Sequence, residues 1–78
     1  MKKKKKARIN IRLKFGQRVK QLRKVQKITQ RKLAFKSKLS REEISRIERG
    51  EKNVALLTSI ALSKGFGIIL KELYNFKY

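Results

Sequence analysis

The fold is decided by residues 29–50, TQRKLAFKSKLSREEISRIERG, in which two short helical patterns follow each other almost without a linker. Thr29 and Ser40 each stand directly before one pattern, and both residue types are favoured helix N-caps. Glu43 follows Ser40 by three residues, which is the spacing of a capping box. These signals predict helices at about 30–37 and about 41–49, joined by a tight turn.

Both predicted helices carry apolar residues three or four positions apart, and this spacing gives a helix one buried face. Leu33 and Ala34 form the inner face of the first, and Ile44 and Ile47 that of the second. Gly50 is expected just beyond the second helix, where glycine commonly ends helices.

The flanking segments also have helical patterns. Phe15, Val19 and Leu22, extended by Ile11 and Val25, predict a helix at about 11–26. After the central pair, the expected core residues are Leu56, Ile60 and Leu62 in a helix at about 55–65, and Leu70 and Leu73 in a helix at about 69–75. Gly67 is expected to end the fourth helix.

The fold class follows from these five helices. Pro is absent, and no strand-like alternation extends beyond a few residues. Residues 9–13 alternate briefly, so an edge strand is the alternative there. We predict an all-α domain at residues 11–78, preceded by a disordered basic arm at residues 1–10, because such dense like charges repel one another.

The charge of the chain is strongly uneven. The net charge is +19, and residues 1–41 hold 18 of the 24 Lys and Arg but no acid. Such a field attracts polyanions. The chain has neither Cys nor His, so we expect no disulfide, no metal site, no cofactor and no enzymatic activity. Its longest uncharged run, residues 53–63, is too short to span a membrane.

Two short, basic helices joined by a tight turn form a candidate helix-turn-helix. In this motif the second helix enters the major groove of DNA and the first crosses the backbone. Residues 42 and 46 lie one turn apart and share a face of the second helix. Arg can bind guanine O6 and N7 with two hydrogen bonds, and Glu can accept one from cytosine N4.

The motif resembles the Cro/C1-type (XRE-like) helix-turn-helix family of transcriptional regulators. The matching residues are Gln30, Leu33, Ala34, Ser40, Ile44, Ile47, Glu48 and Gly50, and the resemblance covers about residues 15–74. It implies a five-helix, lambda-repressor-like fold and sequence-specific binding of double-stranded DNA in a prokaryotic or phage setting. Within the family, a phage repressor, an antitoxin-like autoregulator and a restriction–modification controller protein all fit the chain, and the segment ERGEKNVALLT with the aromatic end resembles the controller type most. Lys38 replaces the usual turn glycine.

Site residues follow from the resemblance and the chemistry together. Arg41, Glu42 and Arg46 are predicted to contact bases; an ion pair between Glu42 and Arg46 is the alternative. Glu43 is assigned to the capping box with Ser40. The resemblance implies a partly buried ion pair between Arg23 and Glu48. Predicted DNA-backbone contacts are Gln30, Ser40, Arg49, Lys52 and Asn53; a solvated surface is the alternative for Arg49 and Lys52.

The basic arm and the aromatic end complete the expectations. The arm is expected to add sequence-independent affinity through Lys2, Lys3, Lys4, Lys5, Lys6 and Arg8. Residues 69–78 carry more apolar side chains than a small monomer buries easily, which favours a homodimer on a palindromic operator. The alternative is that Leu70, Leu73 and Tyr74 close the core.

The predicted partner is double-stranded DNA, and the expected location is the cytoplasm, in association with the nucleoid. We expect the chain to bind neither a membrane nor a small-molecule ligand. Two other functions fit the composition, since both also use excess positive charge. One is a small RNA-binding or ribosome-associated protein, and the other is a membrane-active cationic peptide.

Overall fold

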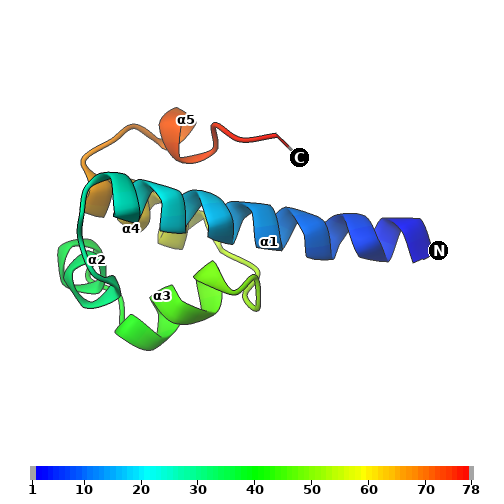
Figure 1. The fold of residues 1–78 in the computed structure, drawn as a ribbon, viewed down its shortest axis with the longest axis horizontal. Helices are drawn as coiled ribbons and strands as arrows, with labels where there is room; N and C mark the ends of the chain where they lie inside the picture. Colours follow the sequence, from blue (N-terminus) through cyan, green and yellow to red (C-terminus); the bar gives the residue numbers. More distant parts are fainter. Residues whose placement is uncertain (1, 78) are drawn as a thin grey trace.

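Five helices and no strand form over residues 2–77 (Figure 1), so the predicted five-helix, all-α fold is confirmed. The structure is a computed structural model that describes the backbone of residues 2–77 and the side chains of residues 11–77. The helices in chain order are α1 Lys2–Val25, α2 Gln30–Ser37, α3 Arg41–Glu48, α4 Leu56–Phe66 and α5 Leu70–Leu73.

The first helix begins earlier than the sequence predicted. It starts at Lys2 instead of near residue 11, so the backbone of residues 2–10 is helical where we expected an irregular arm. Lysine and alanine are good helix formers, and the segment has no Gly or Pro to interrupt the helix that follows. These propensities favour a helix along this segment. The side chains of Lys2, Lys3, Lys4, Lys5, Lys6 and Arg8 lie outside the described residues.

The helices enclose one apolar core. α2 packs against α3 and α4, α1 packs against α3, and α5 packs against α4. Figure 1 shows α1 running along the whole molecule, with α3 on one side of it and α5 on the other. The core is formed by residues from all five helices: Phe15, Val19, Leu33, Ala34, Ile44, Ile47, Leu62, Phe66 and Leu73.

The predicted core was wrong at four positions. Leu56 is 64 % exposed and Val25 is 72 % exposed, and Ile11 is also exposed. Ile60 is only partly buried and lies outside the core. Leu56 and Val25 are the terminal residues of their helices, where few neighbours can cover a side chain. In α4, apolar residues are not confined to one face and two serines are buried, so periodicity alone does not indicate which face is buried.

Two close approaches between helices depend on glycine. A Cβ atom on Gly16 of α1 would lie 2.7 Å from the carbonyl oxygen of Glu48, and a Cβ atom on Gly65 of α4 would lie 2.8 Å from Cβ of Ser37. Both distances are far below van der Waals contact. Gly65, which weakens a helix by propensity, thus lets α4 lie directly on α2.

Two serines are buried in α4, and their polar groups are satisfied inside the helix. The Ser59 hydroxyl donates to the Leu56 carbonyl oxygen at 2.7 Å, and the Ser63 hydroxyl donates to the Ile60 carbonyl oxygen at 2.8 Å. A buried hydroxyl costs little when it is hydrogen-bonded. These serines therefore fit the core-facing side of α4.

The chain end closes over α1. Leu73 is fully buried, and the rings of Tyr74 and Phe76 lie 5.2 and 6.1 Å from the ring of Phe15. Arg18 of α1 donates to the Glu72 carbonyl oxygen at 2.7 Å. Part of the apolar C-terminal segment thus completes the monomer's own core.

Candidate nucleic-acid interface

The turn between α2 and α3 is built by caps on both sides. Thr29 Oγ1 accepts a hydrogen bond from the Lys32 amide at 3.0 Å and begins α2. Lys38 caps the C-terminal end of α2 and has a left-handed backbone with φ of 58°. The next amide, that of Leu39, donates to the Ala34 carbonyl oxygen at 2.9 Å. This C-cap reverses the chain, so only three residues separate the end of α2 from the start of α3.

The start of α3 has the predicted capping box. The Glu43 amide donates to Ser40 Oγ at 3.0 Å, and the Ser40 amide donates to the Glu43 carboxylate at 3.5 Å. Ile44 and Ile47 are buried and fix the rotation of the helix. The first turn of α3 is consequently anchored with its opposite face directed to solvent.

The three predicted base-contacting residues lie on this exposed face. Arg41, Glu42 and Arg46 are all solvent-exposed. Four of the five glutamates form an ion pair with a lysine or an arginine, namely Glu43, Glu48, Glu51 and Glu72. Glu42 is the exception among the described residues, and no ion pair joins it to Arg46 there. The alternative, an ion pair between Glu42 and Arg46, is therefore absent from the described residues.

Glu48 ties three helices together. Its carboxylate accepts hydrogen bonds from Arg23 Nε at 2.8 Å and Arg23 Nη2 at 3.1 Å. Gln30 Nε2 donates to the same carboxylate at 3.1 Å, and Arg23 Nη1 donates to the Ile28 carbonyl oxygen at 3.1 Å. The hydrogen bond to Glu48 raises the pKa of Arg23 above its usual range. The ion pair implied by the resemblance is thus present.

Gln30 has a role that the sequence did not indicate. It was predicted to contact a phosphate, yet its side-chain amide donates to Glu48. Sequence spacing gives no sign of this contact, because the two residues lie in different helices. Gln30 is held at the N-terminus of α2, where exposed backbone amides also favour an anion.

Two of the three predicted backbone-contacting residues after α3 are engaged with acids. Arg49 donates to Glu51 through Nε at 2.8 Å and Nη2 at 3.1 Å, and through Nη1 to Ser45 Oγ at 2.8 Å. Lys52 Nζ donates to Glu43 at 2.7 Å. Asn53 is exposed beside them. The sequence missed these partners; the short Arg49-x-Glu51 spacing was a signal for one, and nothing local indicated the other.

These contacts shift the titration of both acids. The hydrogen bond from Lys52 lowers the pKa of Glu43 below its ordinary value, and the Ser40 amide adds to this effect. The hydrogen bond from Arg49 lowers the pKa of Glu51 in the same way. Both carboxylates are therefore charged at neutral pH and hold their cationic partners.

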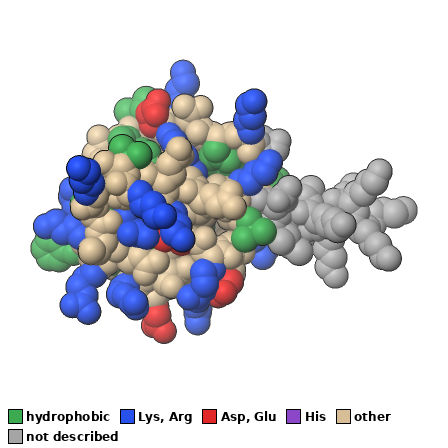
Figure 2. Space-filling view, in the orientation of Figure 1, with side chains coloured by type: hydrophobic (Ala, Val, Ile, Leu, Met, Phe, Trp, Pro, Cys, Tyr) green, Lys and Arg blue, Asp and Glu red, His purple; other side chains and the backbone are tan. Residues whose placement is uncertain are grey.

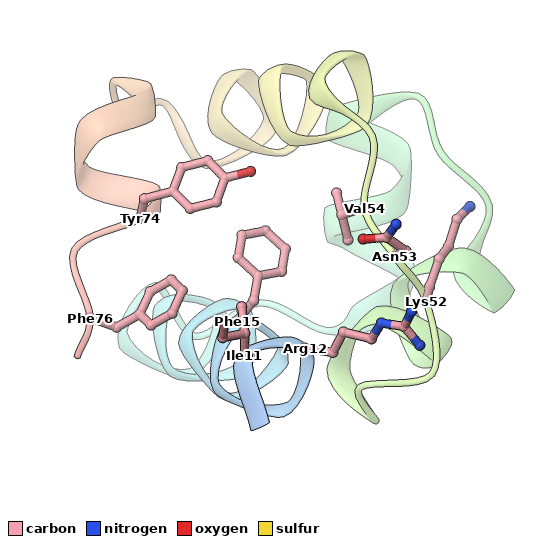
Figure 3. A pocket seen from close by; sticks show the side chains of 8 residues that line it. All are labelled: Ile11, Arg12, Phe15, Lys52, Asn53, Val54, Tyr74 and Phe76. Carbon is pink, nitrogen blue, oxygen red and sulfur yellow. The ribbon is translucent and has the colours of Figure 1, made fainter. Parts of the chain in front are cut away.

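A shallow pocket of about 320 Å³ lies beside this loop (Figure 3). Arg12, Lys52 and Asn53 stand on one side of the pocket, and Tyr74 and Phe76 stand on the other. The pocket places Arg12 of α1 near two predicted backbone-contacting residues, which no sequence pattern indicated.

Basic side chains are spread widely over the surface in Figure 2, including the sides formed by α2 and α3, and acidic ones are few. The residues that the structure describes contain no cluster of three potential metal-ligating His, Cys, Asp or Glu side chains. Among the same residues, every helix is too short or too polar to cross a membrane.

Comparison with known proteins identifies the family of the chain. Residues 19–73 match the helix-turn-helix family, a span that includes α2 and α3. The chain is 47 % identical over 68 residues to the control protein C.BamHI of Bacillus amyloliquefaciens, covering 86 % of this chain and 84 % of that protein. It is 37 % identical over 67 residues to the control protein C.MunI of a Mycoplasma species, and the match covers 85 % of this chain and 90 % of that protein.

A solved structure extends the likeness to the fold. The crystal structure of the restriction–modification controller protein C.AhdI from Aeromonas hydrophila superposes with a TM-score of 0.77 at 39 % identity, covering 80 % of this chain and 94 % of that one. These similarities give no support to the RNA-binding alternative. The chain therefore belongs to the Cro/C1-type helix-turn-helix family of DNA-binding transcription regulators.

Proposed function

We propose that this chain is a controller-type regulator that binds a palindromic operator as a homodimer. Proteins named as control proteins match it over most of its length. The observation that carries the proposal is the outer face of α3, where Arg41, Glu42 and Arg46 are exposed and form no internal ion pair among the described residues.

Glu42 is the most informative residue of this face. A carboxylate near DNA is repelled by phosphates, so its presence needs a compensating contact. Its position at the helix N-terminus gives a modest stabilisation of about 0.3–1 kcal/mol. Accepting a hydrogen bond from cytosine N4 would give it a role in discriminating bases. Arg41 and Arg46 are assigned to guanine, where the two-bond contact discriminates by about 1–3 kcal/mol.

The remaining contacts are assigned to the DNA backbone. Gln30 and Ser40 lie at the N-termini of α2 and α3, where helix dipoles favour phosphate. Arg49, Lys52 and Asn53 follow α3. The basic arm, Lys2–Lys6 with Arg8, adds sequence-independent affinity. Neutralising about 6–8 phosphates would give a slope of about −5 to −7 for log K against log salt.

The homodimer is assigned to the α4–α5 side of the molecule. Leu57 is 78 % exposed and Ile69 is 67 % exposed, and Leu56 and Tyr74 are also exposed there. Two-fold symmetry would place two copies of α3 about one helical turn of DNA apart. A symmetric protein of this kind requires an inverted repeat in its operator.

The test is a selection of random duplex DNA on the purified protein at about 150 mM salt, which weakens non-specific phosphate binding. We expect an enriched inverted repeat. Binding that is tight, salt-sensitive and equal for every polyanion, with no enriched sequence, would contradict the proposal.

Substitutions then show which base pair each base-contacting residue recognises. Arg41→Ala and Arg46→Ala should each relax selection at a different position of the half-site and weaken operator binding by about 5- to 150-fold. Lys64→Ala is the control, because Lys64 is an exposed cation on α4, away from α3. It should leave the selected sequence unchanged.

A further inference from the structure

Two acid–base pairs adjoin α3, and both involve a cation proposed to contact the DNA backbone. Arg49 is held by Glu51 with an Nε–Oε2 distance of 2.8 Å. Lys52 is held by Glu43 with an Nζ–Oε2 distance of 2.7 Å. Both acids lie in or just after α3, within a segment rich in arginine.

The geometry at Arg49 is the one that the residue uses for phosphate. Two nitrogens on one edge of the guanidinium, Nε and Nη2, each donate to a different oxygen of Glu51. Arginine grips phosphate with the same two-donor fork. The third nitrogen, Nη1, donates to Ser45. The carboxylate therefore occupies the donors that a phosphate would need.

The pairing is selective. Arg41 and Arg46 form no ion pair within the described residues, although they lie on the same short helix as Glu43 and Glu48. The other two paired glutamates have structural positions, since Glu48 is buried and Glu72 joins α5 to α1. Among the described residues, carboxylates thus form ion pairs with the cations proposed to contact the backbone and not with those proposed to contact bases, although the charge of Arg46 also lowers the pKa of Glu51.

We propose that Glu51 and Glu43 are internal competitors for the DNA backbone that limit binding to duplexes of any sequence. In the free protein they occupy Arg49 and Lys52. When the protein binds a duplex, each of these cations has two alternatives. It can keep its ion pair with the glutamate, and then it neutralises no phosphate. It can instead bind a phosphate, and then the glutamate is left unpaired beside the negatively charged DNA backbone. Either outcome reduces sequence-independent affinity in a chain of net charge +19. The inference rests on the proposed DNA-binding function.

The experiment compares three glutamine variants of the full chain. Glu51→Gln and Glu43→Gln remove one competitor each, and glutamine preserves the capping box at position 43. Glu72→Gln is the matched control, because it removes the same charge and an ion pair from the α1–α5 side. Affinity for a random-sequence duplex is measured by fluorescence anisotropy between about 50 and 200 mM salt.

We expect Glu51→Gln to bind the random duplex about two- to fivefold more tightly than Glu72→Gln, as loss of an exposed pair would allow. Its slope of log K against log salt should be steeper by about 0.9, the value for one additional phosphate. The Glu43/Glu51 double variant should be steeper by about 1.8.

Equal affinities and slopes for Glu51→Gln and Glu72→Gln would overturn the inference. Glu51 is exposed and lies outside the helices, so its variant does not depend on the capping box of α3. Failure of the proposed function has a different signature. In that case no operator would be enriched from random DNA, while the comparison on a random duplex would remain measurable.

Discussion

Glu48 has only 4 % of its side chain exposed and accepts three hydrogen bonds, two from Arg23 and one from Gln30. Its burial makes the pair structural, because a buried charge that loses its partner remains desolvated without compensation. Glu72 offers a contrast within the same chain. Its side chain is 54 % exposed, so water can replace its partner.

Glu48→Ala should therefore destabilise the protein far more than Glu72→Ala. We expect a loss of about 3–5 kcal/mol in the free energy of unfolding for Glu48→Ala, and less than about 1 kcal/mol for Glu72→Ala. Urea unfolding followed by circular dichroism measures both. Similar losses in the two variants would show that the hydrogen bonds of Glu48 to Arg23 and Gln30 do not hold α1, α2 and α3 together.

Glu43 and Glu51 predict how stability depends on pH. Both have a pKa lowered below the ordinary value of 4.5, mainly by hydrogen bonds from Lys52 and Arg49. Each contributes stability that is fully present above that value and is lost as the pH falls through the lower, folded-state pKa. The melting temperature should decline as the pH is reduced below about 5.

The control for this prediction is the Glu43→Gln, Glu51→Gln double variant. It lacks both titrating groups, so its melting temperature should fall less steeply over the same pH range. Parallel profiles for the two proteins would mean that other groups cause the acid sensitivity.

The turn between α2 and α3 depends on an unusual backbone at one residue. Lys38 has a φ of 58°, a region that costs a residue with a Cβ about 1–2 kcal/mol. The hydrogen bond from Leu39 to Ala34 fixes this conformation. The turn that orients α3 therefore keeps Lys38 in an unfavourable backbone conformation.

Lys38→Gly should stabilise the protein by about 1 kcal/mol, because glycine adopts positive φ without that cost. Lys36→Gly is the matched control, since Lys36 lies within α2 and glycine there should destabilise by about 1 kcal/mol. Thermal unfolding distinguishes the two. A loss of stability in Lys38→Gly would contradict the assignment of strain to this turn.

At the scale of the whole molecule, the exposed apolar residues of α4 and α5 predict self-association. Ile69 lies on the proposed dimer side, and Val25 lies at the end of α1; their exposures, 67 % and 72 %, are similar. Ile69→Lys should weaken dimerisation by at least tenfold, roughly the effect of failing to bury one large aliphatic side chain. Val25→Lys should not.

Sedimentation equilibrium over a range of protein concentrations measures this effect. Equal dimerisation constants for the two variants would place the interface elsewhere on the molecule. A wild-type protein that stays monomeric at every concentration would remove the basis for a palindromic operator.

The sequence by itself determined the central part of this protein. The bounds of α2 were predicted correctly, and those of α3 to within one residue, because Thr29, Ser40 and Glu43 cap helices through contacts only three residues apart. The buried face of α3 followed from the spacing of Ile44 and Ile47. Local rules suffice wherever the interacting groups are neighbours in the chain.

Only the tertiary structure decided the rest. No local pattern in the sequence indicated three features of the structure. These are the Gln30–Glu48 hydrogen bond, the exposure of Leu56 and the Lys52–Glu43 ion pair. The first two depend on how separate helices pack, and the third on how the loop after α3 folds back on that helix. The buried side of α4 carries two serines while two of its leucines are exposed, so its own pattern does not indicate its buried face. The chain's charges were visible in its sequence, but apart from the local Arg49–Glu51 pair their pairing was set by packing, because the other partners are distant in sequence and meet only in the folded chain.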